Sequence, residues 1–331
     1  MITTLEQLEA CLGTAPAAVG MKIIDHLESE ALRWLGVSRL ACLGSVQPAG
    51  VAVTLAGGVD GFARAVRPTR LAIDVAAIDD PQQLRVGYGV GMLFMIPGLG
   101  ETLRVNGRVA NATDASVEIE IDEVYVHCAK AFMRSEFWAA AARSDPPADA
   151  AEFLNQARFL AVATADPEGH ADVSPKGDPA GRLLQLEGAN VSYAERPGNR
   201  RKDSLRNILT QPLAAMLAFI PGVCSVASIT GSARIVSDPS VRERFSVEAK
   251  VPKLITTLED ARIALRPSAV LQRAALWPVA AVAHGIDPAA VLTAHVKLNK
   301  KVGLGATLLR SFVSKAVVNA GLARDYKKHL Y

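Results

Sequence analysis

The chain has 331 residues, of which 50% are hydrophobic and 21% are charged, and its formal net charge is +3. This balance is typical of packed globular proteins, argues against intrinsic disorder and leaves room for two domains. The small net charge gives no indication of a nucleic-acid partner. The apolar runs are strand-sized or broken by Gly, Pro and charged residues, so we expect no transmembrane segment.

The positions of the cysteines and histidines restrict the possible classes of protein further. The four cysteines lie far apart without a CxxC pair, and the six histidines do not cluster with cysteines or carboxylates at ligand spacing. This pattern predicts neither a disulfide framework nor a bound metal. The first residues lack the basic and apolar regions of a signal peptide, so we expect a cytoplasmic protein.

In chain order, helical spacing comes first, over residues 5–35, and short segments rich in β-branched residues follow. Gly, Pro and Asp turns separate these segments at the spacing of a β-barrel. The predicted strands cover residues 39–44, 51–55, 71–75, 92–96, 103–109 and 117–121. A helical segment that starts at His127 closes this unit, and residues 144–150 have the composition of a linker.

Beyond the linker the pattern repeats. Three landmarks recur at one shared offset of 124 positions, namely Pro97-Gly98 with Pro221-Gly222, Gly107 with Gly231, and Asp114 with Asp238. We therefore predict a tandem duplication, with a bulge or tight turn at both Gly107 and Gly231. The expected units are the N-terminal helices with the first copy (1–144), the second copy (151–278) and a basic helical extension (279–331).

The extension carries an excess of Lys and Arg. We expect a helix that packs by its apolar face and leaves its basic face in solvent, and the alternative is contact with a membrane surface or an acidic partner.

Basic and hydroxyl side chains gather at one place in the second copy, where a strand end is followed by a turn into a helix. They are Ser174, Lys176 and Gly177 at the strand end, and Arg196, Asn199, Arg200, Arg201 and Ser204 in the turn. Guanidinium forks, an ammonium group and the free N–H groups of a helix start are typical partners of a phosphate dianion. The pattern predicts a phosphate site.

The first copy lacks this pattern. Ala56 stands where the second copy has Lys176, and Asp79-Asp80 fall opposite Arg200-Arg201. Two carboxylates cannot hold a phosphate without a metal, so we expect this half-site to be inactive. A second motif shows the reverse loss, since Arg104, Asn106 and Lys130 of the first copy correspond to Ser228, Thr230 and Ala269.

Four sequence blocks resemble the pyridoxamine 5′-phosphate oxidase family, whose members are FMN-binding split-barrel proteins. They are ATADPEGHADVSPKGDPAG and RPGNRRKDSLRNIL in the second copy, and IPG…ETLRVNGR and HCAKAFMRSEFW in the first. The resemblance runs from Leu32 to Trp277, and no single copy holds all four blocks. It implies a mainly β fold with flanking helices (α+β), made of two tandem split barrels that form an intrachain pseudo-dimer.

Family members form two-fold dimers with each flavin between the subunits, so a fused pair needs one intact site. The resemblance implies one FMN per chain, its phosphate held by the second copy and its site completed by Arg104, Asn106, Lys130 and Arg134 of the first. It also implies an oxidoreductase acting on a small molecule, with a further homodimer as an open possibility. No catalytic residue is assigned, because the flavin itself carries the hydride chemistry.

Three alternatives stay open at this point. Related split barrels take the deazaflavin F420, so an F420-dependent reductase is one. A haem-binding protein is another, with His127 or a histidine of the extension as the axial ligand. A flavin-binding module without turnover is the third.

Overall fold

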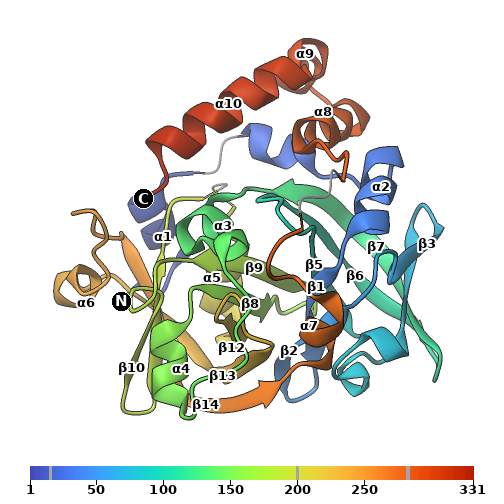
Figure 1. Ribbon diagram of the computed structural model, residues 1–331. Helices are drawn as coiled ribbons and strands as arrows, with labels where there is room; N and C mark the ends of the chain where they lie inside the picture. Colours follow the sequence, from blue (N-terminus) through green and yellow to red (C-terminus); the bar gives the residue numbers. More distant parts are fainter. Residues whose placement is uncertain (15–16, 199–200, 281–283) are drawn as a thin grey trace.

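The computed structural model describes the chain apart from residues 15–16, 199–200 and 281–283. Two seven-stranded antiparallel sheets form its centre, and helices lie on the outside (Figure 1). The expected mainly β fold with two split barrels is confirmed. Two of the predicted site residues, Asn199 and Arg200, lie outside the described residues.

Three short helical segments precede the first sheet: α1 (Leu5–Leu12), η1 (Ala17–Lys22) and α2 (Ser29–Val37). The sheet has the order β2-β1-β5-β6-β7-β4-β3. Its strands are β1 (Leu40–Gln47), β2 (Gly50–Gly57), β3 (Ala63–Arg67), β4 (Arg70–Asp74), β5 (Gly89–Met95), β6 (Thr102–Ala112) and β7 (Ser116–His127). The 3-10 turns η2 (Val75–Ala77) and η3 (Pro81–Gln83) lie between β4 and β5, and α3 (Lys130–Ser135) and η4 (Phe137–Ala139) follow β7.

Helix α4 (Ala150–Gln156) leads into the second sheet, which has the order β10-β11-β14-β13-β12-β8-β9. Its strands are β8 (Phe159–Ala165), β9 (Ala171–Gly177), β10 (Leu184–Glu187), β11 (Asn190–Glu195), β12 (Leu213–Phe219), β13 (Ser225–Val236) and β14 (Leu254–Pro267). Helices α5 (Asp203–Thr210) and α6 (Pro239–Glu243) connect these strands, and α7 (Ala269–Ala274) follows them.

The two sheets have the same topology. When β1 is matched with β8 and so on to β7 with β14, the strand orders are identical. The matched strands β6 and β13 are each irregular at their glycine, Gly107 and Gly231. A Cβ atom would lie 2.0 Å from the Glu120 carbonyl oxygen at Gly107 and 2.8 Å from the Glu259 carbonyl oxygen at Gly231. The predicted bulges are therefore confirmed, and glycine is needed there for close backbone approach.

Strand β3 was not predicted. Its five residues include Arg64 and Arg67 and a single β-branched residue, Val66, and it lies at the edge of the sheet. Edge strands are often short and charged, because this prevents pairing with other chains, and such strands carry little sequence signal.

Each barrel has its own apolar core, and a third apolar cluster joins the two barrels. This junction brings together Phe132 and Phe137 of the first barrel with Phe159 and Trp277 of the second. The ring centroids of Phe137 and Trp277 are 5.1 Å apart, and Trp277 Nε1 donates to the Phe137 carbonyl oxygen at 2.8 Å. The two barrels are thus packed against each other through an aromatic contact of the kind that stabilises protein cores.

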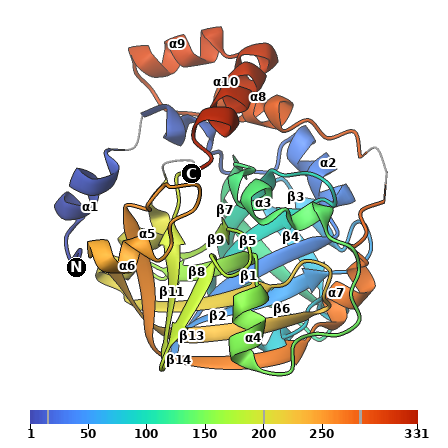
Figure 2. The same cartoon turned by 60° about the vertical axis from the view of Figure 1, so that its left-hand side comes forward.

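The extension forms α8 (Pro288–Leu298), α9 (Leu304–Phe312) and α10 (Lys315–Lys328), which run along one edge of the molecule (Figures 1 and 2). The prediction of helices is confirmed. The expectation that the extension packs by its apolar face is wrong for α9, since this helix has no buried residue and Leu304, Leu308 and Phe312 are exposed. Among the described residues, no helix is both long and apolar enough to cross a bilayer.

Candidate functional site

A cavity of about 530 Å³ lies where the two barrels and the end of the chain meet. Its walls are α3 and the residues before it, the end of β9, the segment that leads to α5, and the last residues of the chain. This volume is in the range of pockets that bind cofactors and drug-sized molecules. Seven of the predicted site residues line it, namely Lys130, Arg134, Ser174, Lys176, Gly177, Arg196 and Arg201.

The strand β9 and the start of α5 form one end of the cavity. Alternation along β9 places Ser174 and Lys176 on one face, and Ser204 Oγ donates to Ser174 Oγ at 2.8 Å. The residue before α5, Lys202, makes no side-chain cap hydrogen bond. The first N–H groups of α5 therefore have no cap from that residue, and they add positive potential beside the cavity.

Gly177 allows α3 to approach β9. A Cβ atom at this position would lie 1.9 Å from the Ala131 carbonyl oxygen. The same contact brings Arg134 over the strand end, where its Nε donates to the Gly177 carbonyl oxygen at 2.8 Å and its Nη1 to the Pro197 carbonyl oxygen at 3.1 Å. A residue of the first barrel is thus fixed to the backbone of the second.

Two cations of the wall, Lys176 and Arg196, are paired with carboxylates. Lys176 Nζ donates to Glu195, whose other oxygen accepts from Thr256 Oγ1 at 2.9 Å. Arg196 Nε donates to Asp178 Oδ2 at 2.8 Å. Burial raises the pKa of Asp178, although Arg196 and Arg134 oppose this shift.

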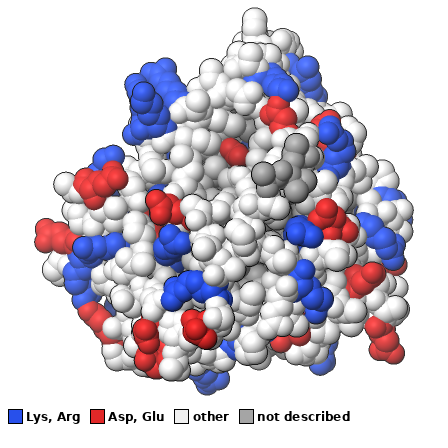
Figure 3. All heavy atoms as spheres, viewed as in Figure 1, with Lys and Arg blue, Asp and Glu red and all other residues white. Residues whose placement is uncertain are grey.

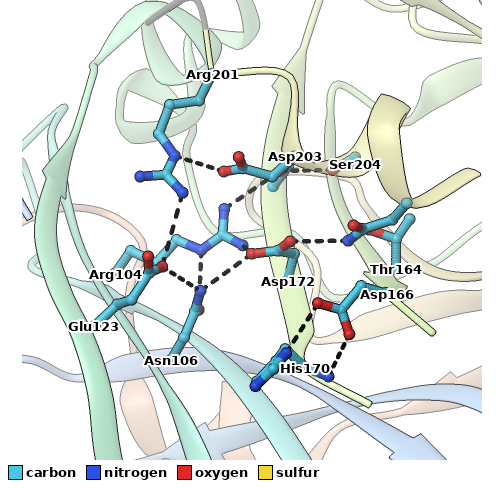
Figure 4. Close-up of polar contacts among 12 residues, drawn as sticks. Arg104, Asn106, Glu123, Thr164, Asp166, His170, Asp172, Arg201, Asp203 and Ser204 are labelled. Atoms are coloured by element: carbon cyan, nitrogen blue, oxygen red, sulfur yellow. Dashed lines mark hydrogen bonds and ion pairs between the residues drawn. The ribbon is translucent and has the colours of Figure 1, made fainter. Parts of the chain in front are cut away.

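Arg104 and Asn106 do not line this cavity. Arg104 is buried and forms an ion pair with Asp172 of the second barrel, and its Nε donates to Asn106 Oδ1 at 3.1 Å (Figure 4). Its Nη1 lies 3.5 Å from Ser174 Oγ. Asp172 also accepts from Asn207 Nδ2 at 2.8 Å. The Arg104 guanidinium group therefore fixes β6 to β9, and Asp172 extends the network to α5, behind the residues that line the cavity.

A second hollow of about 560 Å³ adjoins this network, and Asn106, Asp172 and Arg201 line it. Arg201 lines both hollows; its Nε donates to Asp203 Oδ2 at 2.6 Å and its guanidinium carbon is 4.5 Å from the centroid of the Tyr125 ring. Arg201 therefore stands between the first cavity and this second hollow, which is lined by further acidic residues such as Glu123 and Asp203.

Two residues near the cavity, His127 and Lys22, were missed or left unassigned. His127 lines the cavity, and its buried Nδ1 has no hydrogen-bond partner among the described residues. Burial and the charges of Lys22 and Arg104 hold the pKa of His127 well below its usual value, so the imidazole is neutral. Burial also lowers the pKa of Lys22 to about 8, and its Nζ donates to the Val126 carbonyl oxygen at 2.9 Å. Nothing in the sequence near Lys22 signals this position, because it precedes the repeat.

The end of the chain forms another wall that sequence reasoning did not find. Asp325 Oδ2 lies 2.8 Å from Nζ of the buried Lys130. Tyr326 OH donates to Glu101 Oε1 at 2.7 Å. Arg134 Nη1 donates to the Leu330 carbonyl oxygen at 2.7 Å. The extension has no counterpart within the repeat, so comparison of the two copies gave no signal for these contacts.

The ring of Tyr331 lies between two guanidinium groups, one from each barrel. Its centroid is 6.0 Å from the Arg134 guanidinium carbon and 5.4 Å from that of Arg196. Cation–π contacts at these distances are attractive. Burial and the charge of Asp178 raise the pKa of Tyr331, so its hydroxyl is protonated at neutral pH.

The corresponding place on the first barrel is filled by protein groups. The strand register matches Ala56 with Lys176, because each is the second residue in its hairpin pairing. Asp79 Oδ1 accepts from the Val270 N–H at the start of α7 at 3.0 Å, and Asp80 Oδ2 lies 2.8 Å from Arg266 Nη2. Carboxylates at a helix start satisfy its free N–H groups, so this position holds an anionic side chain of the protein itself.

The fold and the site place the chain in the class of split-barrel proteins. Residues 146–277 match the model of the family described as pyridoxamine 5′-phosphate oxidase. The match lies in the second barrel, which is therefore similar to the pyridoxamine 5′-phosphate oxidase family. No curated protein matches the chain.

Several solved structures are similar to part of the chain. An F420 reductase is 19% identical, with 36% of this chain and 98% of that chain covered and a TM-score of 0.27. The haem storage protein HutZ of Vibrio cholerae is 13% identical, with 35% and 89% covered and a TM-score of 0.26. A pyridoxamine 5′-phosphate oxidase-related, FMN-binding protein of Nostoc punctiforme is 16% identical, with 37% and 79% covered and a TM-score of 0.25.

Proposed function

We propose that the chain binds one FMN in the cavity between its two barrels and is an FMN-dependent oxidoreductase for a small-molecule substrate. The observation that carries this proposal is the excess of cations in the cavity wall. Among the described residues that line it, eight are Lys or Arg and two are carboxylates, Glu195 and Asp325. A concave site with this excess favours a ligand with several negative charges.

The phosphate would lie at the end formed by β9 and α5. Lys176 and Arg201 would neutralise it, with Ser174 and Ser204 as hydroxyl partners and the start of α5 as a source of N–H groups. Asn199 and Arg200 belong to the same proposed set on the grounds of sequence alone. The fit rests on the uncapped start of α5 and on Gly177, whose missing Cβ leaves room for α3 at the cavity wall.

The first barrel would supply the opposite side through Lys130, Arg134 and His127, which line the cavity. Arg104 and Asn106 would act as positioning residues, because they hold Asp172 and approach Ser174 without lining the cavity. When bound, the flavin would supply hydride transfer, and the protein would bind, orient and shield it. This division makes the chain an intrachain pseudo-dimer with one flavin site, since Asp79 and Asp80 fill the other position.

Haem is the second candidate, and one observation favours it: His127 lines the cavity and has a buried ring nitrogen for which the described part of the chain offers no partner. The cation-rich wall fits the propionate groups of haem as well as a phosphate. A deazaflavin cofactor such as F420 fits the same anionic preference, and direct identification of the bound molecule separates the three.

Fluorescence titration of FMN with Arg201→Ala tests the phosphate assignment, and Arg64→Ala is the matched control because Arg64 is exposed on the edge strand β3. Loss of one charge-assisted phosphate contact should weaken FMN binding about tenfold or more in Arg201→Ala. Arg64→Ala should bind as the wild type does. Equal affinity of both variants, with unchanged thermal unfolding, would exclude Arg201 from the phosphate site.

A further inference from the structure

Helix α9 turns its apolar residues toward solvent. Leu304, Leu308 and Phe312 recur every four residues on one face, and they are 87%, 56% and 75% exposed. Val302, just before the helix, is 93% exposed. Contiguous exposed apolar side chains of this size mark interaction surfaces in soluble proteins.

The charged residue of α9 faces the protein instead. Arg310 is half-buried, and its Nη1 donates to the carbonyl oxygens of Asn299 at 3.0 Å and Lys301 at 2.7 Å. These bonds fix the rotation of α9 about its axis. The outward apolar face is therefore set by specific hydrogen bonds on the inner face.

Lysine residues flank the apolar face. Residues 288–324 contain no Asp or Glu, and their Lys and Arg residues are Lys297, Lys300, Lys301, Arg310, Lys315 and Arg324. The side chains of Lys300 and Lys315 are 77% and 59% exposed even though each pairs with an aspartate. The upper edge in Figure 3, where the extension lies, is mostly uncharged, with Lys and Arg beside it and some Asp or Glu just below.

We propose that α9 and its basic flanks, residues 297–315, dock on an anionic lipid surface. Leu304, Leu308 and Phe312 enter the acyl boundary, while the lysines lie near lipid phosphates. The helix lies at the outer edge of the molecule as a projecting ridge (Figures 1 and 2). A deformable bilayer surface accepts such a ridge without a preformed groove, and its negative charge complements the lysines. This docking surface does not depend on the identity of the cofactor.

The test is sedimentation of the full-length protein with vesicles of phosphatidylcholine alone, or of phosphatidylcholine with phosphatidylglycerol. Binding to the anionic vesicles should be stronger by about tenfold or more, and should fall as salt is added. The variant Leu308→Glu/Phe312→Glu should lose about tenfold or more of this binding. The control Val59→Glu/Val86→Glu changes two residues that are 69% and 60% exposed elsewhere, and should bind like the wild type.

All four substituted residues are exposed, so thermal unfolding should change little and will show whether each variant is folded. Equal vesicle binding by the α9 variant and its control would overturn the proposal, as would the absence of any preference for anionic vesicles. Self-association without lipid that Leu308→Glu/Phe312→Glu abolishes would also overturn it, because the face would then bind a second copy of the chain.

Discussion

Asp325, near the end of the chain, forms an ion pair with Lys130 at the start of α3, with 2.8 Å between Oδ2 and Nζ. The Lys130 side chain is 1% exposed, whereas that of Asp325 is 43% exposed. A buried ammonium group without its partner is costly. This pair therefore couples the position of the extension to the wall of the proposed flavin site.

Replacing Asp325 by Asn should lower the free energy of unfolding by about 1–2 kcal/mol, a value below that of a fully buried pair because Asp325 is partly solvated. Urea unfolding measures this difference. The control Lys300→Gln removes an exposed pair of the same extension and should change stability by less than about 0.5 kcal/mol. A control effect as large as that of Asp325→Asn would contradict the special role of the buried pair.

Tyr331 should slow the release of bound FMN, because its ring contacts Arg134 and Arg196 at the cavity. Tyr331→Ala removes two cation–π contacts of about 0.5–1 kcal/mol each, so FMN should leave this variant roughly tenfold faster than the wild type. Tyr331→Phe keeps the ring and should release FMN as the wild type does. Stopped-flow fluorescence after dilution gives the rates, and similar release from Tyr331→Ala would show that the extension is not a wall of the site.

Much of the fold could be predicted from the sequence, and the reasons are local. The alternating residues of β7 and the matched glycines Gly107 and Gly231 are signals within single strands or between the two copies. The extension could not be placed in this way, since the contact of Asp325 with Lys130 depends on the path of the chain in space.

The candidate site was predicted in part for the same reason. Lys176 lies at the end of β9 and Arg201 in the segment between β11 and α5, and each belongs to a run of basic and hydroxyl residues that can be recognised in the sequence by itself. The burial of Arg104 could not be foreseen, because its partner Asp172 comes from the other barrel. Motif matching finds the residue types that a site needs, but it does not separate those that line the cavity from those that support them.

Gly177 should not tolerate a side chain. The Cβ atom of Gly177→Ala would meet the Ala131 carbonyl oxygen, forcing α3 away from β9. We expect a loss of about 1–3 kcal/mol of stability together with weaker FMN binding. Gly36→Ala in α2 is the control, since its Cβ has no atom within 4 Å, and helix propensity predicts equal or slightly greater stability. A Gly177→Ala protein as stable as Gly36→Ala would contradict the close contact.

Lys22 should make stability rise with pH above about 8. Its pKa is lowered by burial from 10.5 to about 8 in the folded protein, so between these values the unfolded chain binds more protons than the folded one. The free energy of unfolding therefore increases with pH in this window. Lys22→Met should lack this part of the increase. Its free energy of unfolding relative to that of the wild type should therefore be higher at pH 7 than above this window. Parallel pH profiles for wild type and variant in urea unfolding would show that Lys22 is not a buried titrating group.

A single flavin site between the two packed barrels is tested most directly by the identity and amount of the cofactor that heat releases from the purified protein. We expect a flavin absorption spectrum and about one FMN per chain, because the position on the first barrel is filled by Asp79 and Asp80. Two FMN per chain would contradict the single site. A haem spectrum, or a colourless protein that does not bind added FMN, would contradict the cofactor assignment.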